Sequence, residues 1–173
     1  MEEAVKVAYL LIPAYFANMS PVFFKNVNFL NFPVDLGKKL NGKPIFGKNK
    51  SVRGIFFASI VGIVVAFIQY LLNFESLHLV DYSYFYIIGF LLGFGALLGD
   101  LVESFFKRRL NLKPGSPFIP FDQIDYLLGG AVLISIFYSV PFFPLIVVLV
   151  FAIPIHIVVN FISYKLKLRD TAI

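Results

Sequence analysis

Acidic and basic side chains crowd into one short segment of this 173-residue chain, residues 99–125. Four polar residues near its start are spaced i, i+3, i+4 and i+7: Asp100, Glu103, Ser104 and Lys107. Residues with this spacing share one face of a helix. Because the sequence before them is apolar, we expect the polar face to be confined to one end of a membrane-spanning helix.

Two further acids, Asp122 and Asp125, lie three residues apart just after Pro120. Proline suits the first turn of a helix, so Pro120 indicates where the next helix begins. Two consecutive spans run antiparallel, and the acids at the end of one and the start of the next therefore lie at the same membrane face. We expect them to converge there.

Four carboxylates beside lysines are typical of a site for Mg²⁺ and a polyphosphate. Mg²⁺ prefers oxygen ligands, and basic side chains bind phosphate. Ionisable residues at membrane depth usually serve an ion or a substrate. The expected metal ligands are Asp100, Glu103, Asp122 and Asp125, which together with Lys107 form the expected catalytic set. Ser104 and Lys113 are expected to bind phosphate.

The same residues allow simpler interpretations. The acids and bases could form surface ion pairs, which contribute about 0.2–0.5 kcal/mol each. Arg108 and Arg109 fit a topology signal at the end of a span at least as well as a phosphate contact.

A second basic segment, residues 47–54, reads GKNKSVRG and is rich in glycine and lysine. It lacks the spacing of a P-loop. We expect residues of this segment to bind phosphates from the side opposite the metal. These residues are Gly47, Lys48, Lys50, Ser51 and Gly54. The alternative is a solvated loop attracted to anionic lipid head groups.

Isolated polar residues leave two interpretations open. Asn18, followed by Pro21, could line a polar cavity or bond a neighbouring helix. Asp35 could be a turn residue or part of the site, and His156 fits a hydrogen-bonded packing residue best. The absence of cysteine excludes disulfides and thiol nucleophiles, and with only two histidines a structural zinc site is not expected.

Composition makes this a membrane protein, since 59% of the residues are hydrophobic, 14% are charged and the mean hydropathy is +0.84. A membrane-spanning helix needs about 20 mainly apolar residues. The sequence predicts an all-α polytopic protein forming a single domain over residues 1–173. Its five expected spans are residues 5–24, 54–74, 82–107, 121–140 and 142–164.

Positive charge predicts the orientation. All 15 Lys and Arg residues except Lys6 lie in the first connection (25–53), around the third connection (108–120) or in the tail. Because Lys and Arg are retained in the cytoplasm, these segments and the C-terminus are expected inside and the N-terminus outside. The site would then lie at the cytoplasmic face of the cell membrane.

The motifs in 104–125 resemble the CTP-dependent phosphatidate cytidylyltransferase family. The matching residues are Ser104-Phe105-Phe106-Lys107-Arg108, Lys113, Ser116, Ile119, Pro120 and Asp122-Gln123-Ile124-Asp125. Gln123 stands where the family pattern has Arg, and Pro114 stands where it has an acid. The whole chain is similar to the archaeal branch, the CDP-archaeol synthases, which share its length, its five spans, an Asn-x-x-Pro element like Asn18–Pro21, and its Gly/Lys loop.

This resemblance implies an enzyme that uses CTP and Mg²⁺. It would transfer CMP to unsaturated archaetidic acid, an isoprenoid glycerol phosphate lipid (2,3-bis-O-geranylgeranylglyceryl phosphate), and release pyrophosphate. It also implies that Asn18, Pro21 and Pro120 belong to the substrate site.

Three other functions stay open at this point: a CDP-diacylglycerol synthase acting on ester lipids, a small ion transporter, and a membrane scaffold with a basic inner surface. No nucleic-acid partner is expected. The oligomeric state is open, with a homodimer as one option.

Overall fold

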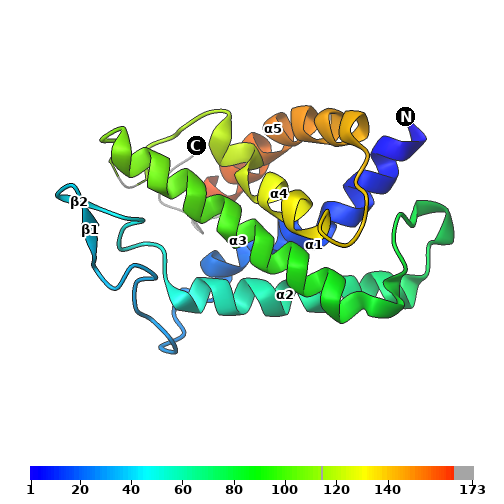
Figure 1. The fold of residues 1–173 in the computed structure, drawn as a ribbon, viewed down its shortest axis with the longest axis horizontal. Coiled ribbons are helices and arrows are strands. Elements are labelled where there is room, and N and C mark those ends of the chain that lie inside the picture. Colours follow the sequence, from blue (N-terminus) through cyan, green and yellow to red (C-terminus); the bar gives the residue numbers. More distant parts are fainter. Residues whose placement is uncertain (114, 166–173) are drawn as a thin grey trace.

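The computed structural model describes residues 1–113 and 115–165, and the regular secondary structure within them is helical apart from one short hairpin and an isolated bridge (Figure 1). Pro114 and the basic tail residues Lys167 and Arg169 lie outside the described residues. The elements are α1 (Glu2–Phe23), β1 (Lys39–Leu40), β2 (Lys43–Pro44), α2 (Val52–Leu72), η1 (Glu75–Leu77), η2 (Tyr82–Tyr84), α3 (Phe85–Arg109), α4 (Phe121–Ile134) and α5 (Phe142–Lys165). The predicted all-α class is confirmed.

Three helical segments are long and apolar enough to cross a membrane: Val52–Leu72, Tyr82–Arg109 and Phe142–Lys165. The other two predicted spans, which correspond to α1 and α4, are not among these segments. The first turns of α1 carry Glu2, Glu3 and Lys6, and α4 has only 14 residues. Membrane character is therefore clear from three helices.

Helix α4 ends earlier than residue 140, where the sequence predicted its end. The hydroxyl of Ser135 donates to the carbonyl of Ala131 at 2.6 Å, and the amide of Ser135 donates to the same oxygen at 3.0 Å. The next amides, of Ile136 and Phe137, bond three residues back, so the backbone tightens into turns. The apolar run continues, but the α-helix does not.

Glycines bring α2 and α3 into backbone contact. A Cβ added to Gly62 of α2 would overlap backbone atoms of Gly89 and Gly93 of α3. In a membrane, where lipid tails are as apolar as side chains, close packing of this kind is a main source of helix association.

Glycines also bring α3 and α4 into backbone contact. A Cβ on Gly129 would overlap backbone atoms of Gly95 and Gly99. Helix α3 is therefore held between α2 and α4 by backbone contacts on two sides, within its residues 89–99.

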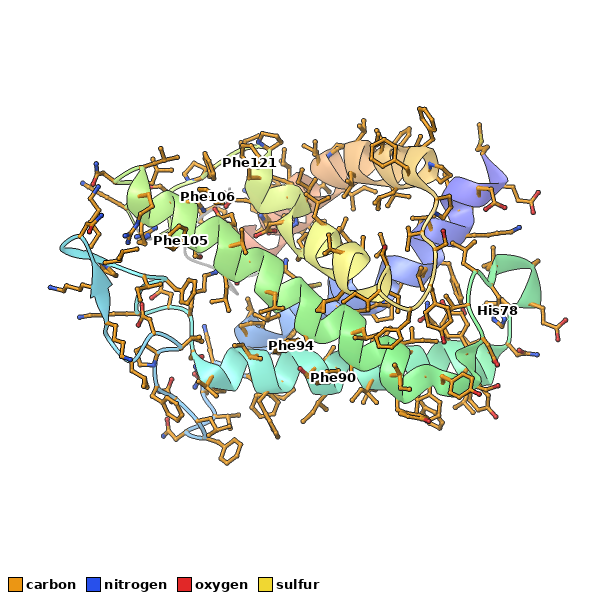
Figure 2. The ribbon with its side chains drawn as sticks, in the orientation of Figure 1. His78, Phe90, Phe94, Phe105, Phe106 and Phe121 are labelled. Atoms are coloured by element: carbon orange, nitrogen blue, oxygen red, sulfur yellow. The ribbon has the colours of Figure 1, made fainter. Side chains whose placement is uncertain are left out.

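Helices α1 and α5 complete the bundle in different ways. Helix α1 packs against α2, α3, α4 and α5, whereas α5 packs only against α1 and α4 among the described elements. Only Ala152 and Asn160 of α5 are buried. Most of its apolar surface is thus free to face lipid, as the outward side chains in Figure 2 show.

The connections separate to opposite ends of the bundle. The loop between α1 and α2, with its hairpin, lies at the same end as the C-terminal end of α3, and η1 lies at the other end (Figure 1). His78 occupies this second end, far from Phe105, Phe106 and Phe121 (Figure 2). The two basic connections therefore share one end, as the charge pattern predicted.

The glycine contact between α2 and α3 can be tested with two alanines in one helix. Gly62→Ala should lower the free energy of unfolding by about 1–3 kcal/mol, because the new methyl group forces α3 away. Gly54→Ala is the matched control: its Cβ would lie 3.7 Å from Pro21 Cγ, an ordinary contact. Thermal unfolding in detergent measures both, and a Gly62→Ala protein as stable as wild type would contradict the packing argument.

Candidate active site

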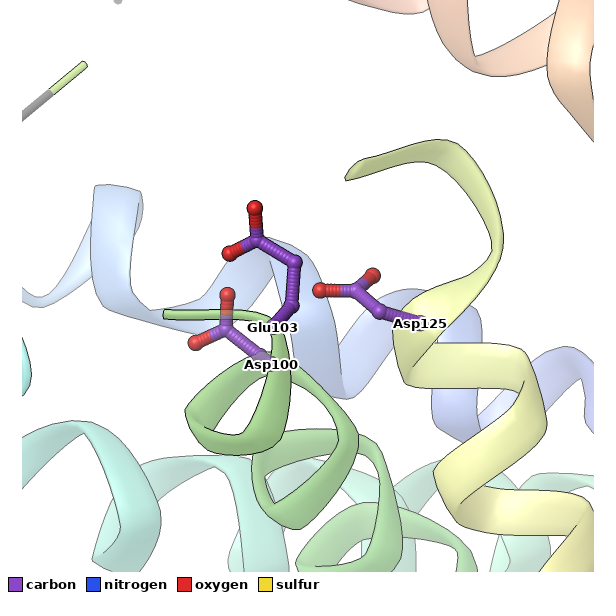
Figure 3. A group of neighbouring side chains, drawn as sticks. All are labelled: Asp100, Glu103 and Asp125. Atoms are coloured by element: carbon purple, nitrogen blue, oxygen red, sulfur yellow. The ribbon is translucent and has the colours of Figure 1, made fainter. Parts of the chain in front are cut away.

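Asp100 and Glu103 of α3 and Asp125 of α4 form a group of three carboxylates, here named the acidic cluster. One oxygen from each residue lies within 4.8 Å of the others. Figure 3 shows the three side chains converging from the two helices. Glu103 is buried, and Asp100 and Asp125 are partly exposed.

The crossing of α3 and α4 creates this cluster. A Cβ on Gly99 would overlap the carbonyl oxygen of Asp125, so the two backbones touch immediately beside the acids. Any larger residue at position 99 would separate Asp100 from Asp125. The sequence placed these acids at one membrane face, and the glycine contact explains why they meet.

Two lysines balance the acids. Lys50 Nζ, from the α1–α2 loop, lies 2.6 Å and 2.7 Å from the two carboxylate oxygens of Asp100. Lys107 Nζ lies 2.8 Å from Glu103 Oε1 and also pairs with Asp122. Without such partners, clustered carboxylates would repel one another and resist burial.

Asp122 takes a different position from the other predicted metal ligands. It pairs with Lys107, and its second oxygen accepts the amide of Phe118 at 2.6 Å. It lies one turn before Asp125 on α4 and outside the acidic cluster.

A cavity of about 340 Å³ opens onto the acidic cluster. It is lined by parts of α1, the α1–α2 loop, α3, the α3–α4 connection, α4 and α5. Eleven predicted site residues line it: Asn18, Pro21, Gly47, Lys48, Lys50, Asp100, Glu103, Ser104, Lys107, Asp122 and Asp125. The structure therefore gathers residues that are distant in sequence around one space.

Four predicted site residues lie outside this lining: Ser51, Gly54, Lys113 and Pro120. Ser51 is the N-cap of α2, and its hydroxyl accepts the amide of Gly54 at 3.2 Å. Pro120 precedes the first residue of α4, and Lys113 is exposed on the α3–α4 connection. Ser51 thus caps α2, and the carbonyl of Pro120 accepts the amide of Gln123 at 3.1 Å in the first turn of α4.

Other cavity residues were not selected from the sequence. Arg108, Asn49 and Gln123 line the cavity. So do His156, Asn160 and Ser163 of α5, which are spaced i, i+4 and i+7 and thus share one face of that helix. Three polar residues on one face of an otherwise apolar span are themselves a signal that the face meets a polar space.

His156 has the packing contact expected from the sequence and also faces the site. Its Nδ1 lies 3.5 Å from the hydroxyl of Tyr126, and it lines the cavity. The two interpretations of His156 are therefore compatible.

The donor set of the acidic cluster fits Mg²⁺. It consists of carboxylate oxygens, the hard ligands that Mg²⁺ favours, and it opens into a cavity with room for water and phosphate ligands. Nearby Lys48, Lys50, Lys107 and Arg108 supply positive charge for phosphate. The arrangement suits chemistry on a nucleotide polyphosphate at a membrane surface.

The chain is similar to known proteins over nearly its whole length. The family model described as CarS-like CDP-archaeol synthase matches residues 1–173. Similar curated proteins include CDP-archaeol synthases of Methanocaldococcus jannaschii, at 34% identity over 94% of this chain and 93% of the relative, and of Pyrococcus furiosus, at 35% identity over 98% of both. The protein of Pyrococcus abyssi is 37% identical over 94% of both chains.

A solved structure supports the fold. It is described as an intramembrane enzyme for archaeal membrane lipid biosynthesis. It matches with a TM-score of 0.67 and 28% identity, over 88% of this chain and 90% of that one. The full-length family match, the identities of 34–37% and the shared fold show together that this chain belongs to the CDP-archaeol synthase family.

Proposed function

We propose that this protein transfers CMP from CTP to the phosphate of an archaeal ether lipid, giving CDP-archaeol and pyrophosphate. The proposed acceptor is unsaturated archaetidic acid, with two geranylgeranyl chains. The observation that carries the proposal is the convergence of the acidic cluster with Lys50 and Lys107 in one cavity.

The proposed topology has five spans, with the N-terminus outside and the cavity at the cytoplasmic face. Both Lys-rich connections lie at the cavity end of the bundle, which is the arrangement that retention of positive charge in the cytoplasm favours. Helix α4 and the turns after it would together cross the membrane.

A lipid acceptor is supported by an apolar groove of about 470 Å³ between α1, α4 and α5. Its lining is apolar side chains such as Leu11, Leu127 and Phe151. Tyr15 lines both this groove and the polar cavity. We place a hydrocarbon chain of the acceptor in the groove, so that its phosphate reaches the cavity at Tyr15.

The reaction is a displacement at phosphorus. An oxygen of the lipid phosphate forms a bond to the α-phosphorus of CTP, the bond from that phosphorus to the β-phosphate oxygen breaks, and pyrophosphate leaves. A phosphate monoester is anionic near neutral pH, so no side chain has to remove a proton. Lys48, Lys50, Lys107 and Ser104 would bind phosphates and reduce repulsion between the two anions.

Asp100, Glu103 and Asp125 would hold Mg²⁺, with Asp122 as the proposed fourth ligand. When bound, Mg²⁺ would neutralise charge on the triphosphate and on the departing pyrophosphate. Asp122 orients the ammonium group of Lys107 in this structure.

The direct test is to incubate the purified protein with each of the four nucleoside triphosphates, Mg²⁺ and the ether lipid phosphate. Pyrophosphate release should require CTP and lipid together and should stop with EDTA. Equal release with UTP, or release without lipid, would contradict the proposal. A parallel assay with phosphatidic acid separates the ester-lipid enzyme, and ion flux into liposomes without CTP turnover would favour a transporter.

The acidic cluster is tested by Asp125→Asn. Loss of a charged ligand should lower kcat by about a hundredfold or more, without changing the thermal stability by much. Glu75→Gln, on the exposed η1 helix at the other end of the bundle, is the control and should keep full activity. Wild-type turnover by Asp125→Asn in Mg²⁺ would reject the metal assignment.

Substitutions at two exposed lysines test whether the triphosphate binds in the cavity or on the surface beside it. Lys48 lines the cavity and Lys113 lies outside its lining. Lys48→Met should raise the KM for CTP roughly tenfold, because a charged phosphate contact is lost, while Lys113→Met should change it by less than about twofold. Steady-state kinetics measures both, and the reverse order would show that the triphosphate lies along the α3–α4 connection instead.

A further inference from the structure

Asp35 is a buried carboxylate in the loop between α1 and α2, with 7% of its surface exposed. Its Oδ1 accepts the amide of Gly37 at 2.9 Å. Its Oδ2 accepts the amides of Phe46 and Gly47, each at 3.0 Å. One side chain thus fastens two stretches of the loop that are about ten residues apart.

These bonds fix the backbone of the loop segment that faces the acidic cluster, residues 46–50, here named the strip. Five consecutive residues from Phe46 to Lys50 line the cavity. Beyond the carboxylate, the amide of Val34 donates to the carbonyl of Lys50 at 2.8 Å, and Pro33 bridges to Ser51. The segment around Asp35 is therefore hydrogen-bonded to both ends of the strip and fixes the backbone that carries Lys48 and Lys50.

The direction of the bonds matters for phosphate binding. The amide of Gly47 donates to Asp35 and is therefore already occupied. The groups of this segment that are left to bind a phosphate are the side chains of Lys48 and Lys50. Lys50 already reaches Asp100 at 2.6 Å. Gly47 has φ +102°, a left-handed backbone conformation that glycine allows.

The carboxylate is suited to this task because it stays ionised. Burial alone would raise the pKa of Asp35, but the N–H groups of Gly47, Phe46 and Gly37 outweigh burial and hold its pKa below the usual value. An asparagine would lose one acceptor oxygen and would turn an NH₂ group toward an N–H donor. At least one of the three backbone bonds would then break.

We propose that Asp35 is a positioning residue for CTP, which fixes the backbone of residues 46–50 so that Lys48 and Lys50 face the triphosphate. This inference rests on the proposed function. It predicts an effect on CTP binding. The acidic cluster should change less, because the backbone contact of α3 and α4 positions its three carboxylates and the loop contributes Lys50 at Asp100.

Kinetics of the whole enzyme tests the role. Asp35→Asn should raise the KM for CTP about tenfold, with kcat at saturating CTP and the KM for the lipid within about threefold of wild type. Asp81→Asn is the matched control, since Asp81 also accepts a backbone amide, that of Ser83 at 2.9 Å, at the other end of the bundle. A KM for CTP as little changed in Asp35→Asn as in Asp81→Asn would overturn the proposal, and so would a loss confined to kcat.

A double-mutant cycle tests whether Asp35 acts through the strip. In a Lys48→Met background, the effect of Asp35→Asn on the KM for CTP should shrink to threefold or less, because part of the strip's contact is already gone. A full tenfold effect there would contradict the proposal.

Hydrogen exchange keeps the inference testable if the variant folds poorly. In the wild-type protein the amides of Phe46 and Gly47 should be protected, and Asp35→Asn should speed their exchange at least tenfold. Exchange at the unprotected rate in wild type would overturn the proposal. A wild type that exchanges as expected but makes no CDP-lipid would instead reject the proposed function and leave the loop architecture standing.

Discussion

The backbone contact between α3 and α4 at Gly99 is the constraint on which the site depends. Because Gly99 has no side chain, the carbonyl of Asp125 can approach it, and carboxylates from two helices come within 4.8 Å. In a bilayer, the association of these helices rests on close packing and hydrogen bonds. The glycines of α2 and α3 extend the same contact across the bundle, so packing and site geometry have one cause.

Bringing like charges together in a buried place requires compensation, and the loop between α1 and α2 provides much of it. Lys50 neutralises Asp100 from the loop, and Lys107 neutralises Glu103 and Asp122 from α3. Arg109 fastens the hairpin to α3 by donating to the carbonyls of Leu40 and Pro44, while Lys43 donates back to the carbonyl of Arg109 at 3.1 Å. The polar loop and the apolar bundle therefore form one unit around the cavity.

The sequence was enough to predict what local patterns determine. Charge-free runs located the helices, and the i, i+3 and i+7 spacing placed Asp100, Glu103 and Lys107 on one face. The sequence could not predict which polar groups bind one another, because this depends on contacts between distant segments. Asp122 pairs with Lys107 outside the acidic cluster, and Asp35 binds amides about ten residues away. The phosphate role of Ser51 stays a prediction, and its place before an apolar run also indicates the helix cap that the structure shows. On α5 the sequence prediction concerned His156 alone, although Asn160 and Ser163 share its helix face and line the same cavity.

We propose that Asp100, Glu103 and Asp125 share one divalent cation that also binds the triphosphate of CTP. Anomalous diffraction from crystals grown with Mn²⁺ and CTP tests it most directly. We expect a manganese peak within direct coordination distance of carboxylate oxygens from both α3 and α4, next to the triphosphate. A peak that touches the nucleotide but neither helix, or one that lies away from the acidic cluster, would contradict it.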